Sequence, residues 1–257
     1  MPLKLNKLTE KYIQERTGTL MEDQRDLLAE PPQTTNALAL ENYHDNVGED
    51  ACELGLLLYQ QEGREADIQA QLRLAGEHLC QMHAVRDIPV EGEYRIPWLF
   101  LKALALAVSF PGKTPLRSLA AFEEWRYYGR EEHPEAKQLV RYLGILKAFV
   151  GGLELDDRTA MSIQDQAALD SASKYERRFL LPQIRALRAV AAGNQDGFTA
   201  AMKELLQSHQ AEAAKGELAK EAEGLMCLPG LMLAKLARDR GMQAGVESPY
   251  LPVKLLE

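Results

Sequence analysis

Near the end of the chain, residues 228–236 form a nearly continuous apolar run that has to lie inside the fold. Pro229 suits the first turn of a helix, where a backbone N–H has no partner within the helix. Gly241, which follows the run, is typical of the left-handed residue that ends a helix. A helix that is apolar on every side must be covered by other elements. The rest of the chain therefore has to surround this helix.

The residues after Gly241 form a tail with little conformational freedom. Pro249 and Pro252 each exclude helical backbone angles from the residue before them. We therefore expect residues 246–257 to run extended and to fold back on the buried helix. Tyr250 lies between the two prolines, and we expect its ring to be buried and its hydroxyl group to be hydrogen-bonded.

The remainder of the sequence has a helical pattern. Apolar residues recur at spacings of three and four, and no stretch alternates apolar and polar residues long enough to indicate a sheet. Prolines and glycines divide the pattern into about ten segments, which predicts an all-α fold. Gly18 and Gly48 are expected to interrupt helices, and Thr34 or Thr35 to cap one. We predict a single globular domain over residues 1–257, because this length provides an ample core.

Two helical hairpins in the sequence resemble each other. Gly63 and Gly193 each end one helical segment and precede another. Five, nine and twelve residues beyond these glycines lie three apolar pairs: Ile68 and Phe198, Leu72 and Met202, and Ala75 and Leu205. The matched offsets suggest two helix–turn–helix units with the same packing faces, so that the fold is partly repeat-like.

Charge and cysteine content limit the class of protein. The 30 Lys and Arg residues against 38 Asp and Glu give a formal net charge of −8. Phosphate backbones repel an acidic protein, so a basic protein is favoured as partner over a nucleic acid. The three widely spaced cysteines are expected to be buried and reduced: Cys52, Cys80 and Cys227.

Neither the N-terminus nor the apolar segments predict a membrane protein. Residues 1–18 carry charges every few residues and lack the apolar core of a signal peptide. The longest apolar run, residues 98–110, contains Lys102 and is too short to span a bilayer. We therefore expect a cytoplasmic protein with no membrane partner.

The residues that resemble catalytic or metal-binding groups have structural explanations. His78, Cys80 and His83 have metal-ligand side chains, but only Cys80 and His83 share a helix face, and zinc requires three or four ligands. Asp156 and Asp157 are typical of residues that begin a helix. Aromatic side chains are interpreted as packing at Trp125, Tyr127 and Tyr128, and three histidines as solvated: His44, His133 and His209. With no glycine-rich phosphate loop and no GxSxG motif, we predict no catalytic residue, no metal and no cofactor.

Two segments resemble the immunity protein 49 family. The C-terminal segment contains RDRG, a short polar link, VESPYLP and a Leu-Leu pair, and it is similar to the C-terminal signature of that family. Residues 187–210, LRAVAAGNQDGFTAAMKELLQSHQ, resemble the helix–Gly–Asn/Asp–helix hairpin of the family. The resemblance implies an all-helical protein that binds a cognate antibacterial toxin.

By the same resemblance, the protein protects the producing cell by stoichiometric occlusion of the toxin, without chemistry of its own. The toxin would be a secreted effector of interbacterial competition, with type VI secretion as a route of delivery. A nuclease toxin needs a basic surface to hold phosphate backbones, so an acidic immunity protein suits a basic nuclease domain. Two alternatives remain open. One is a helical-repeat adaptor that binds another protein or a peptide, and the other is an all-α enzyme that uses a pair of acids.

The distribution of charge suggests where a toxin binds. Residues 41–67 hold eight acids and one base, Arg64, so this stretch carries −7. Clustered like charges cost a few tenths of a kcal/mol per close pair, and a solvated acidic surface or a docking surface for a basic protein would explain them. We predict that exposed acids on both sides of Gly48 bind the toxin: Asp45, Glu49, Asp50 and Glu53.

Overall fold

The computed structural model describes residues 5–85, 97–113, 119, 136–151, 176–244 and 246–256. These residues contain eight α-helices and no β-strand, which confirms the predicted all-α class. About ten helices were predicted for the whole chain, and eight lie in the described ranges. The α-helices are α1 (Glu10–Ala29), α2 (Ala37–Gln60), α3 (Glu65–Ala84), α4 (Pro97–Ser109), α6 (Ala136–Val150), α9 (Leu181–Ala191), α10 (Gln195–Lys215) and α11 (Leu228–Arg238).

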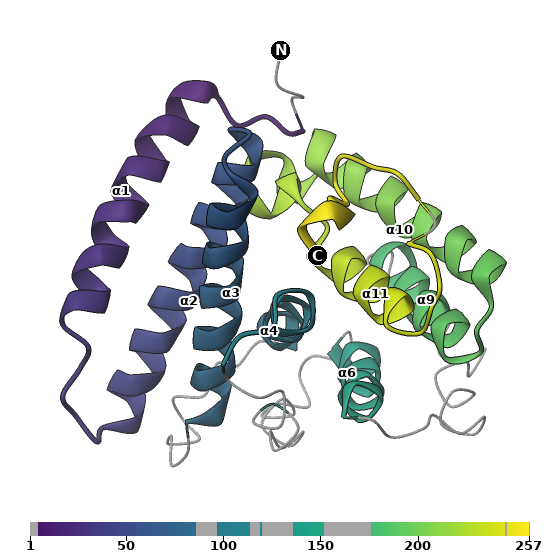
Figure 1. Cartoon of the computed structure of the whole chain (residues 1–257), viewed down its shortest axis with the longest axis horizontal. Helices are drawn as coiled ribbons and strands as arrows, with labels where there is room; N and C mark the ends of the chain where they lie inside the picture. The colour runs from purple at the N-terminus through teal and green to yellow at the C-terminus, as the bar shows by residue number, and fades with distance from the viewer. Residues whose placement is uncertain are drawn as a thin grey trace.

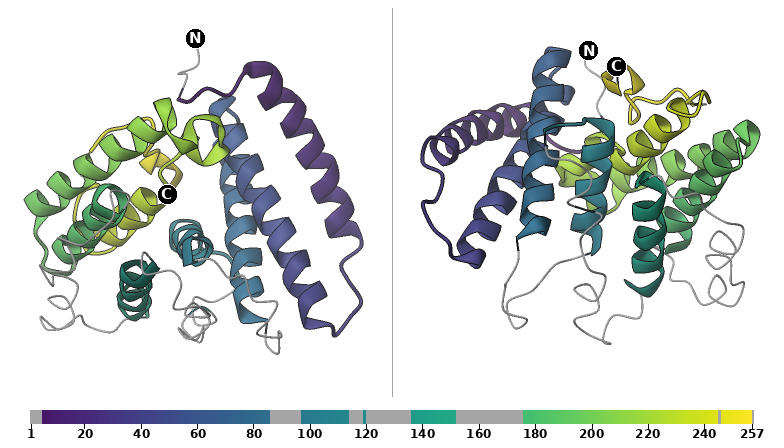
Figure 2. Two further views of the ribbon diagram at one scale, coloured as in Figure 1. Left: turned by 180° about the vertical axis from the view of Figure 1, so that it is seen from behind. Right: turned by 60° about the horizontal axis from the view of Figure 1, so that its bottom comes forward.

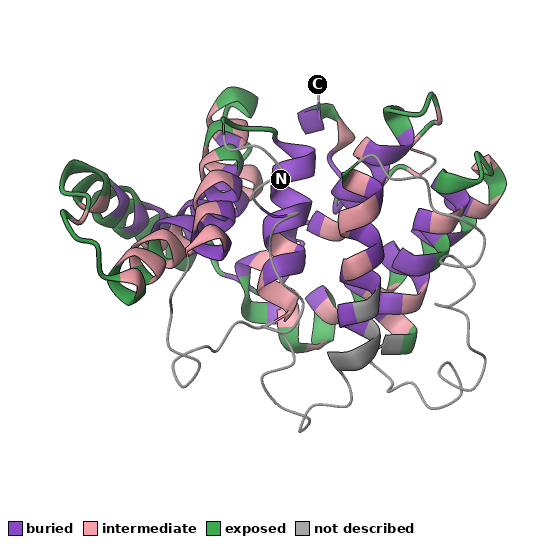
Figure 3. Cartoon of the chain, turned by 90° about the horizontal axis from the view of Figure 1, so that it is seen from below, coloured by how far each residue is buried: buried purple, intermediate pink, exposed green. Residues whose placement is uncertain are grey.

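Four shorter helical turns complete the described secondary structure: the π-helix η3 (Glu176–Leu180) and the 3-10 helices η4 (Glu217–Lys220), η5 (Ala222–Leu225) and η6 (Val253–Leu256). Helices α1, α2 and α3 lie on one side of the molecule, and α9, α10 and α11 lie on the other (Figure 1). Helix α4 packs against both α3 and α11 and so joins the two sides, as the two further views also show (Figure 2). The helix surfaces that face the interior are buried, whereas the connection between α1 and α2 is exposed (Figure 3).

Side chains at the starts of the helices accept hydrogen bonds from backbone N–H groups that have no partner within the helix. Thr9 accepts a bond from the N–H of Tyr12 at the start of α1. Asn36 caps α2 by accepting a bond of 3.1 Å from the N–H of Ala39. The prediction of Thr34 or Thr35 as the cap of this helix was wrong by one or two residues, because Asn36 occupies the position from which a side-chain oxygen reaches the first turn.

Helices α1 and α2 continue through the two glycines that were expected to interrupt them. Gly18 lies within α1, and Gly48 lies within the 24-residue α2. The predicted break at Gly48 was wrong, and packing gives the reason. A Cβ atom at Gly48 would lie 2.7 Å from the side chain of Leu79 in α3. Gly48 therefore allows α2 and α3 to pack closely, and it does not end a helix.

The C-terminal helix is covered on nearly every side, as predicted. In α11 the residues from Leu231 to Ala234 are all fully buried, and Pro229 lies in the first turn. Gly241 has φ +74°, and the next N–H, that of Met242, donates to the carbonyl of Ala237 over 3.0 Å. This pattern is the left-handed helix ending that the sequence predicted.

The tail is extended in part only. The chain turns at residues 249–250 and ends in the 3-10 helix η6, in which Leu255 and Leu256 are buried. The N–H of Cys227 donates to the carbonyl of Tyr250 over 2.8 Å, which fixes the tail to the start of α11. The Tyr250 side chain is 7% exposed and its hydroxyl group donates to the carbonyl of Leu5 over 2.7 Å, which confirms the prediction for this residue.

The two matched hairpins have the same packing positions. Helix α3 begins two residues after Gly63, and α10 begins two residues after Gly193. All six matched apolar side chains are buried: Ile68, Leu72, Ala75, Phe198, Met202 and Leu205. The turns differ, because the residue with positive φ is Glu62 in the first hairpin and Gly193 in the second.

None of the described helices has an apolar stretch long enough for a membrane crossing.

Replacing a glycine inside a helix with alanine usually stabilises a protein, but the close packing at Gly48 predicts the opposite effect there. Gly48→Ala should destabilise the fold by about 1–3 kcal/mol, because the new methyl group overlaps the buried Leu79 side chain. The matched control is Gly18→Ala in α1, where no atom lies within 4 Å of the added Cβ. This change should stabilise by about 0.5–1 kcal/mol, since alanine favours a helix over glycine. Chemical denaturation measures the change in the free energy of unfolding for each variant. If both variants stabilise the fold, or both destabilise it, the packing argument is contradicted.

The buried tyrosine of the tail predicts a second pair of variants. Tyr250→Ala should cost about 3–5 kcal/mol through the cavity that it leaves, and Tyr250→Phe about 1–3 kcal/mol, because the Leu5 carbonyl loses its donor. Tyr59→Phe is the control, since the Tyr59 hydroxyl group also donates to a backbone carbonyl, that of Pro249, but at an exposed site. Water replaces that bond, so its loss should cost less than about 0.5 kcal/mol. An unchanged denaturation midpoint for Tyr250→Ala would show that the tail does not stabilise the fold.

Candidate partner-binding site

The four acids predicted to bind a partner lie in the middle of α2 and are half-buried. Asp45, Glu49 and Glu53 follow one another at intervals of four residues, and Asp50 lies next to this row, so the four occupy adjacent positions on one side of the helix. We call this group the α2 acids. The expectation that they are exposed at a helix end was wrong, because α2 continues past Gly48 and packs against α1, α3 and η5.

Glu53 is engaged in an ion pair with α1. The Arg16 guanidinium donates from Nε to Oε1 over 3.0 Å and from Nη2 to Oε2 over 2.6 Å. The side chains are 35% and 24% exposed, so the pair is partly shielded from solvent. A two-bonded arginine–carboxylate pair fixes the orientation of both groups. Glu53 therefore helps to hold α1 against α2, and its charge is locally neutralised.

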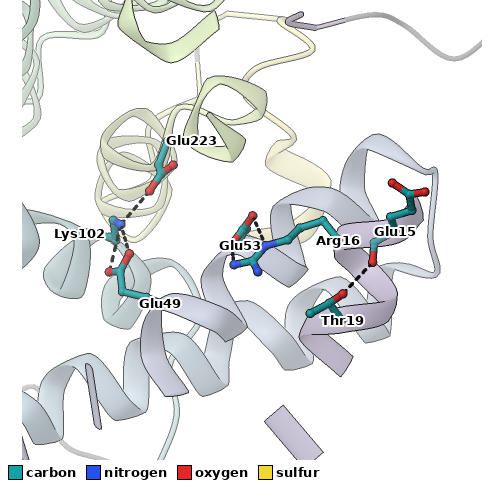
Figure 4. A network of polar contacts seen from close by, with 7 residues as sticks. All are labelled: Glu15, Arg16, Thr19, Glu49, Glu53, Lys102 and Glu223. Atoms are coloured by element: carbon teal, nitrogen blue, oxygen red, sulfur yellow. Dashed lines mark hydrogen bonds and ion pairs between the residues drawn. The ribbon is translucent and has the colours of Figure 1, made fainter. Parts of the chain in front are cut away.

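Glu49 belongs to a second charged cluster (Figure 4). The Lys102 ammonium of α4 donates to both carboxylate oxygens of Glu49, over 2.7 and 3.1 Å, and to Oε1 of Glu223 in η5 over 2.9 Å. The Lys102 side chain is 17% exposed, and each glutamate side chain is 39% exposed. One cation thus links α2, α4 and η5, and the cluster keeps one net negative charge.

Burial and the neighbouring charges set the pKa values in this cluster. Burial raises the pKa of Glu49 above its ordinary value, although Lys102 opposes the shift. At Glu223, burial also raises the pKa, but the attraction and hydrogen bond of Lys102 outweigh it, and the net shift is downward. Burial lowers the pKa of Lys102, but its anionic neighbours prevail and the pKa lies above its usual range. Cys52 lies near Lys102 as well, but burial raises the pKa of its thiol to about 12, so it is uncharged at neutral pH. The anionic neighbours of Lys102 are then the two glutamates.

The other two α2 acids have no ion pair within 4 Å among the described residues. Burial raises the pKa of Asp45, and the nearby Glu41 raises it further. Burial also raises the pKa of Asp50, while Arg16 opposes the shift and Asp23 of α1 adds to it. Asp45 and Asp50 are therefore the α2 acids whose charge is least compensated.

Sequence reasoning missed the basic partners of these acids. Arg16 is 37 residues from Glu53, and Lys102 is 53 residues from Glu49 and 121 from Glu223. Spacing along the chain does not reveal such pairs. One signal was present, because Lys102 interrupts an otherwise apolar helix. A lysine at such a position requires a buried anionic partner.

The negative charge of the chain is concentrated in its first three helices. Residues 10–84 contain 15 acids and 5 bases, which gives −10. The remaining residues contain 23 acids and 25 bases, which gives +2. Burial lowers the pKa of two histidines in this range, to about 4 at His78 and below its ordinary value at His44, which works against a positive charge on either. The α1–α3 side of the molecule therefore carries the excess negative charge of the chain and attracts cations.

The structure does not bring the candidate metal ligands together. Cys80 and His83 are both buried in the core, where the His83 ring packs against Phe100 at 5.0 Å. His78 points elsewhere and meets His44, with 3.2 Å between their Nδ1 atoms. Within the described ranges, no three His, Cys, Asp or Glu side chains are grouped as they are around a metal ion.

The structure confirms the prediction for the cysteines and contradicts the one for His209. All three cysteines are buried and free, as expected: Cys52, Cys80 and Cys227. His209 was expected in solvent, but it is 6% exposed, with burial lowering its pKa to about 4, because α10 turns it toward the carbonyl of Gly224 and the ring of Tyr250. Six further candidates lie outside the described residues: Trp125, Tyr127, Tyr128, His133, Asp156 and Asp157.

Comparison with known proteins gave one finding. A sequence model of a family described as immunity protein 49 matches residues 98–255. The matched segment begins in α4 and runs to the C-terminal tail, whereas α1, α2 and α3 precede it. No curated protein and no solved structure matched the chain.

The Lys102 cluster predicts a pH-dependent loss of stability. Lys102→Met leaves two half-buried carboxylates without their cation, which should cost about 2 kcal/mol at pH 7, less than for a fully buried pair because both glutamates are partly exposed. Without Lys102, burial holds both folded-state pKa values above the unfolded-state values. Such groups bind protons more tightly in the folded state, so the variant should regain stability relative to wild type as the pH falls from 7 toward 4.

The control for this variant is Lys254→Met. Lys254 also pairs with a glutamate, Glu65, over 2.6 Å, but the side chains are 63% and 53% exposed. Its loss should change stability by less than about 0.5 kcal/mol at any pH. Urea denaturation of both variants between pH 4 and 8 measures the effect. A loss at Lys102→Met that stays constant over this range would show that the carboxylates are not destabilised by burial.

Proposed function

Because the chain belongs to the immunity protein 49 family, we propose that it binds a cognate toxin and neutralises it by covering a functional surface in a 1:1 complex. The toxin is a secreted effector used in competition between bacteria, with type VI secretion as its route, and the immunity protein acts in the cytoplasm of the producing cell. Inhibition requires no catalysis and no cofactor, only a lasting interface.

The observation that carries this proposal beyond the family is the charge asymmetry. Residues 10–84 carry −10, while the rest of the chain carries +2. Charges of one sign on one side of a protein speed its association with a partner of opposite charge and orient the encounter. The partner therefore presents a basic surface. A nuclease toxin has such a surface because it must hold a phosphate backbone.

The α2 acids contribute to this docking surface in two ways. Asp45 and Asp50 form no ion pair among the described residues, so their charge is the least compensated of the four. Glu49 and Glu53 are bound by Lys102 and Arg16, so their carboxylates are held in fixed positions before the toxin arrives. Groups that are already ordered lose less conformational entropy on binding. Exposed acids of α1, such as Asp23, extend the same surface.

The experiment for the proposal is a titration of the toxin activity with this protein. The toxin is the product of the gene beside the immunity gene, purified as its catalytic domain. Residual activity should fall linearly to zero at about one equivalent, because a tight complex removes one toxin molecule per immunity protein. Complete inhibition at a small fraction of an equivalent would instead indicate turnover and contradict occlusion.

The charge argument predicts the effect of paired variants on the association rate. The double variant Asp23→Asn, Asp50→Asn removes two negative charges from the α1–α3 side and should slow association about threefold to tenfold at low salt, with a shallower salt dependence. The control, Asp196→Asn with Glu247→Gln, removes two charges from exposed positions elsewhere. It should leave the rate within about twofold of wild type. Both are measured by stopped flow over a salt series, and equal rates for the two variants would place the docking surface elsewhere.

Reversal of Glu49 is not a suitable test of binding. A lysine at this position would face Lys102, which is largely buried. The variant would lose stability and toxin affinity together, so the two effects could not be separated.

A further inference from the structure

A small pocket lies beside the Lys102 cluster, between α4, α9, α10, η4 and the start of α11. Its volume is about 180 Å³. Most of its wall is apolar, with contributions from Trp98, Leu101, Phe179, Leu205 and Met226. The exposed Glu217 and the half-buried Leu218 also line it, so the pocket reaches the surface. We call it the Gln183 pocket, after the polar side chain in its wall.

Gln183 has an unused hydrogen-bond acceptor. The side chain is 2% exposed, and its Nε2 atom donates to the carbonyl of Phe179 over 2.9 Å. Its Oε1 atom is buried and has no hydrogen-bond partner among the described residues. Buried acceptors in native proteins nearly always have a donor. Because Gln183 lines the pocket, an entering group with an N–H would supply one once the side-chain amide turns its Oε1 toward the cavity.

Among the described residues that line the pocket, carboxylates outnumber bases. Glu212, Glu217 and Glu223 line it, against one base, Lys102. Lys102 is already bonded to Glu49 and Glu223. Glu212 pairs with Arg178 over 3.0 Å, which leaves Glu217 without an ion pair among the described residues. The electrostatic environment at the mouth of the pocket therefore favours a partner with basic residues next to the group that enters.

The size of the pocket favours a single side chain as its occupant. Pockets for small molecules usually have volumes of about 300–1,000 Å³, whereas this pocket has about 180 Å³. Protein interfaces often depend on a tryptophan, tyrosine or arginine that fills a pocket of the partner. The choice among these three follows from the chemistry of the wall.

Tryptophan matches the wall best. Its indole offers a large apolar surface and one N–H donor with no acceptor, which suits an apolar wall with one unpaired acceptor. A tyrosine hydroxyl group would bring a further acceptor into the apolar site. An arginine would bring five N–H donors and a charge into a mostly apolar wall with one unpaired acceptor, which leaves most of its donors without partners.

We propose that the Gln183 pocket receives a tryptophan side chain of the bound toxin, with the indole N–H donating to Oε1 of Gln183 and basic residues of the toxin facing Glu217. This proposal rests on the proposed function. The Lys102 cluster makes the pocket continuous with the α2 acids, because Glu49 binds the same ammonium group that lines the pocket. In this proposal, one toxin surface contacts both.

The pocket can be tested without the toxin, with indole as the probe. Indole should shift the methyl NMR signal of Met226, which lines the pocket, and should bind about tenfold more tightly than benzofuran, which has the same shape without the N–H. Gln183→Leu should bring the two affinities to within about twofold. Equal binding of the two compounds to wild type, or no shift at Met226, would overturn the proposal.

A second variant keeps the test independent of the folding of Gln183→Leu. Leu218→Trp places a bulky side chain at the half-exposed rim and should abolish indole binding. Leu74→Trp is the matched control, since Leu74 is also half-buried but lies on α3, away from the pocket. It should bind indole as wild type does. Indole binding that survives Leu218→Trp would show that indole binds elsewhere.

The same variants then separate this proposal from the proposed function. Leu218→Trp should weaken toxin binding at least about tenfold, whereas the double variant Asp196→Asn, Glu247→Gln should not. If the toxin binds wild type and Leu218→Trp equally, the pocket proposal fails while the proposed function stands. If wild type does not bind the toxin at all, the proposed function fails, and with it the assignment of the occupant, whatever indole does.

Discussion

The arrangement of the two sides of the molecule depends on one ammonium group, that of Lys102. Helix α4 lies between α3 and α11 and is apolar on nearly every side, so Lys102 has little access to water. A largely buried cation requires anions close by. Glu49 from α2 and Glu223 from η5 supply them, and this requirement fixes how these three elements meet. Such clusters add little net stability over an apolar contact, but they permit fewer alternative packings.

Local chemistry along the chain was sufficient to predict the helical class and many helix ends. Pro229 and Gly241 act through their own backbone geometry, and α11 has Pro229 in its first turn and the left-handed Gly241 after its end. The prediction of a break at Gly48 was wrong because a glycine within a helix can have two different effects. It weakens the helix, but it also allows another helix to approach. The neighbouring Leu79 decides between them, and it is 31 positions away in the sequence.

The sequence predicted which acidic residues form the candidate site, but not how far their side chains are buried. The excess of acids before residue 84 is visible in the sequence, whereas the burial of the α2 acids depends on the packing of α2 against α1, α3 and η5. Arg16 and Lys102 cannot be assigned to their carboxylates from spacing alone. The Gln183 pocket was not predictable at all, because its wall is assembled from residues between Trp98 and Pro229. An unpaired acceptor such as Oε1 of Gln183 becomes evident only when its surroundings are known.

The charge excess and the pocket act over different distances, which gives them different roles in the proposed complex. Charges on α1–α3 act over roughly a Debye length, about 8 Å at physiological salt, and so guide the toxin before contact. Contacts in the pocket act only at van der Waals range and govern how long the complex lasts. The charge excess lies in helices that precede the matched family segment, while all the described residues that line the pocket lie inside it. A chain built in this way can alter its charged helices to suit a different toxin surface while it keeps the pocket. The Lys102 cluster limits that freedom, because any change at Glu49 also alters the wall of the pocket.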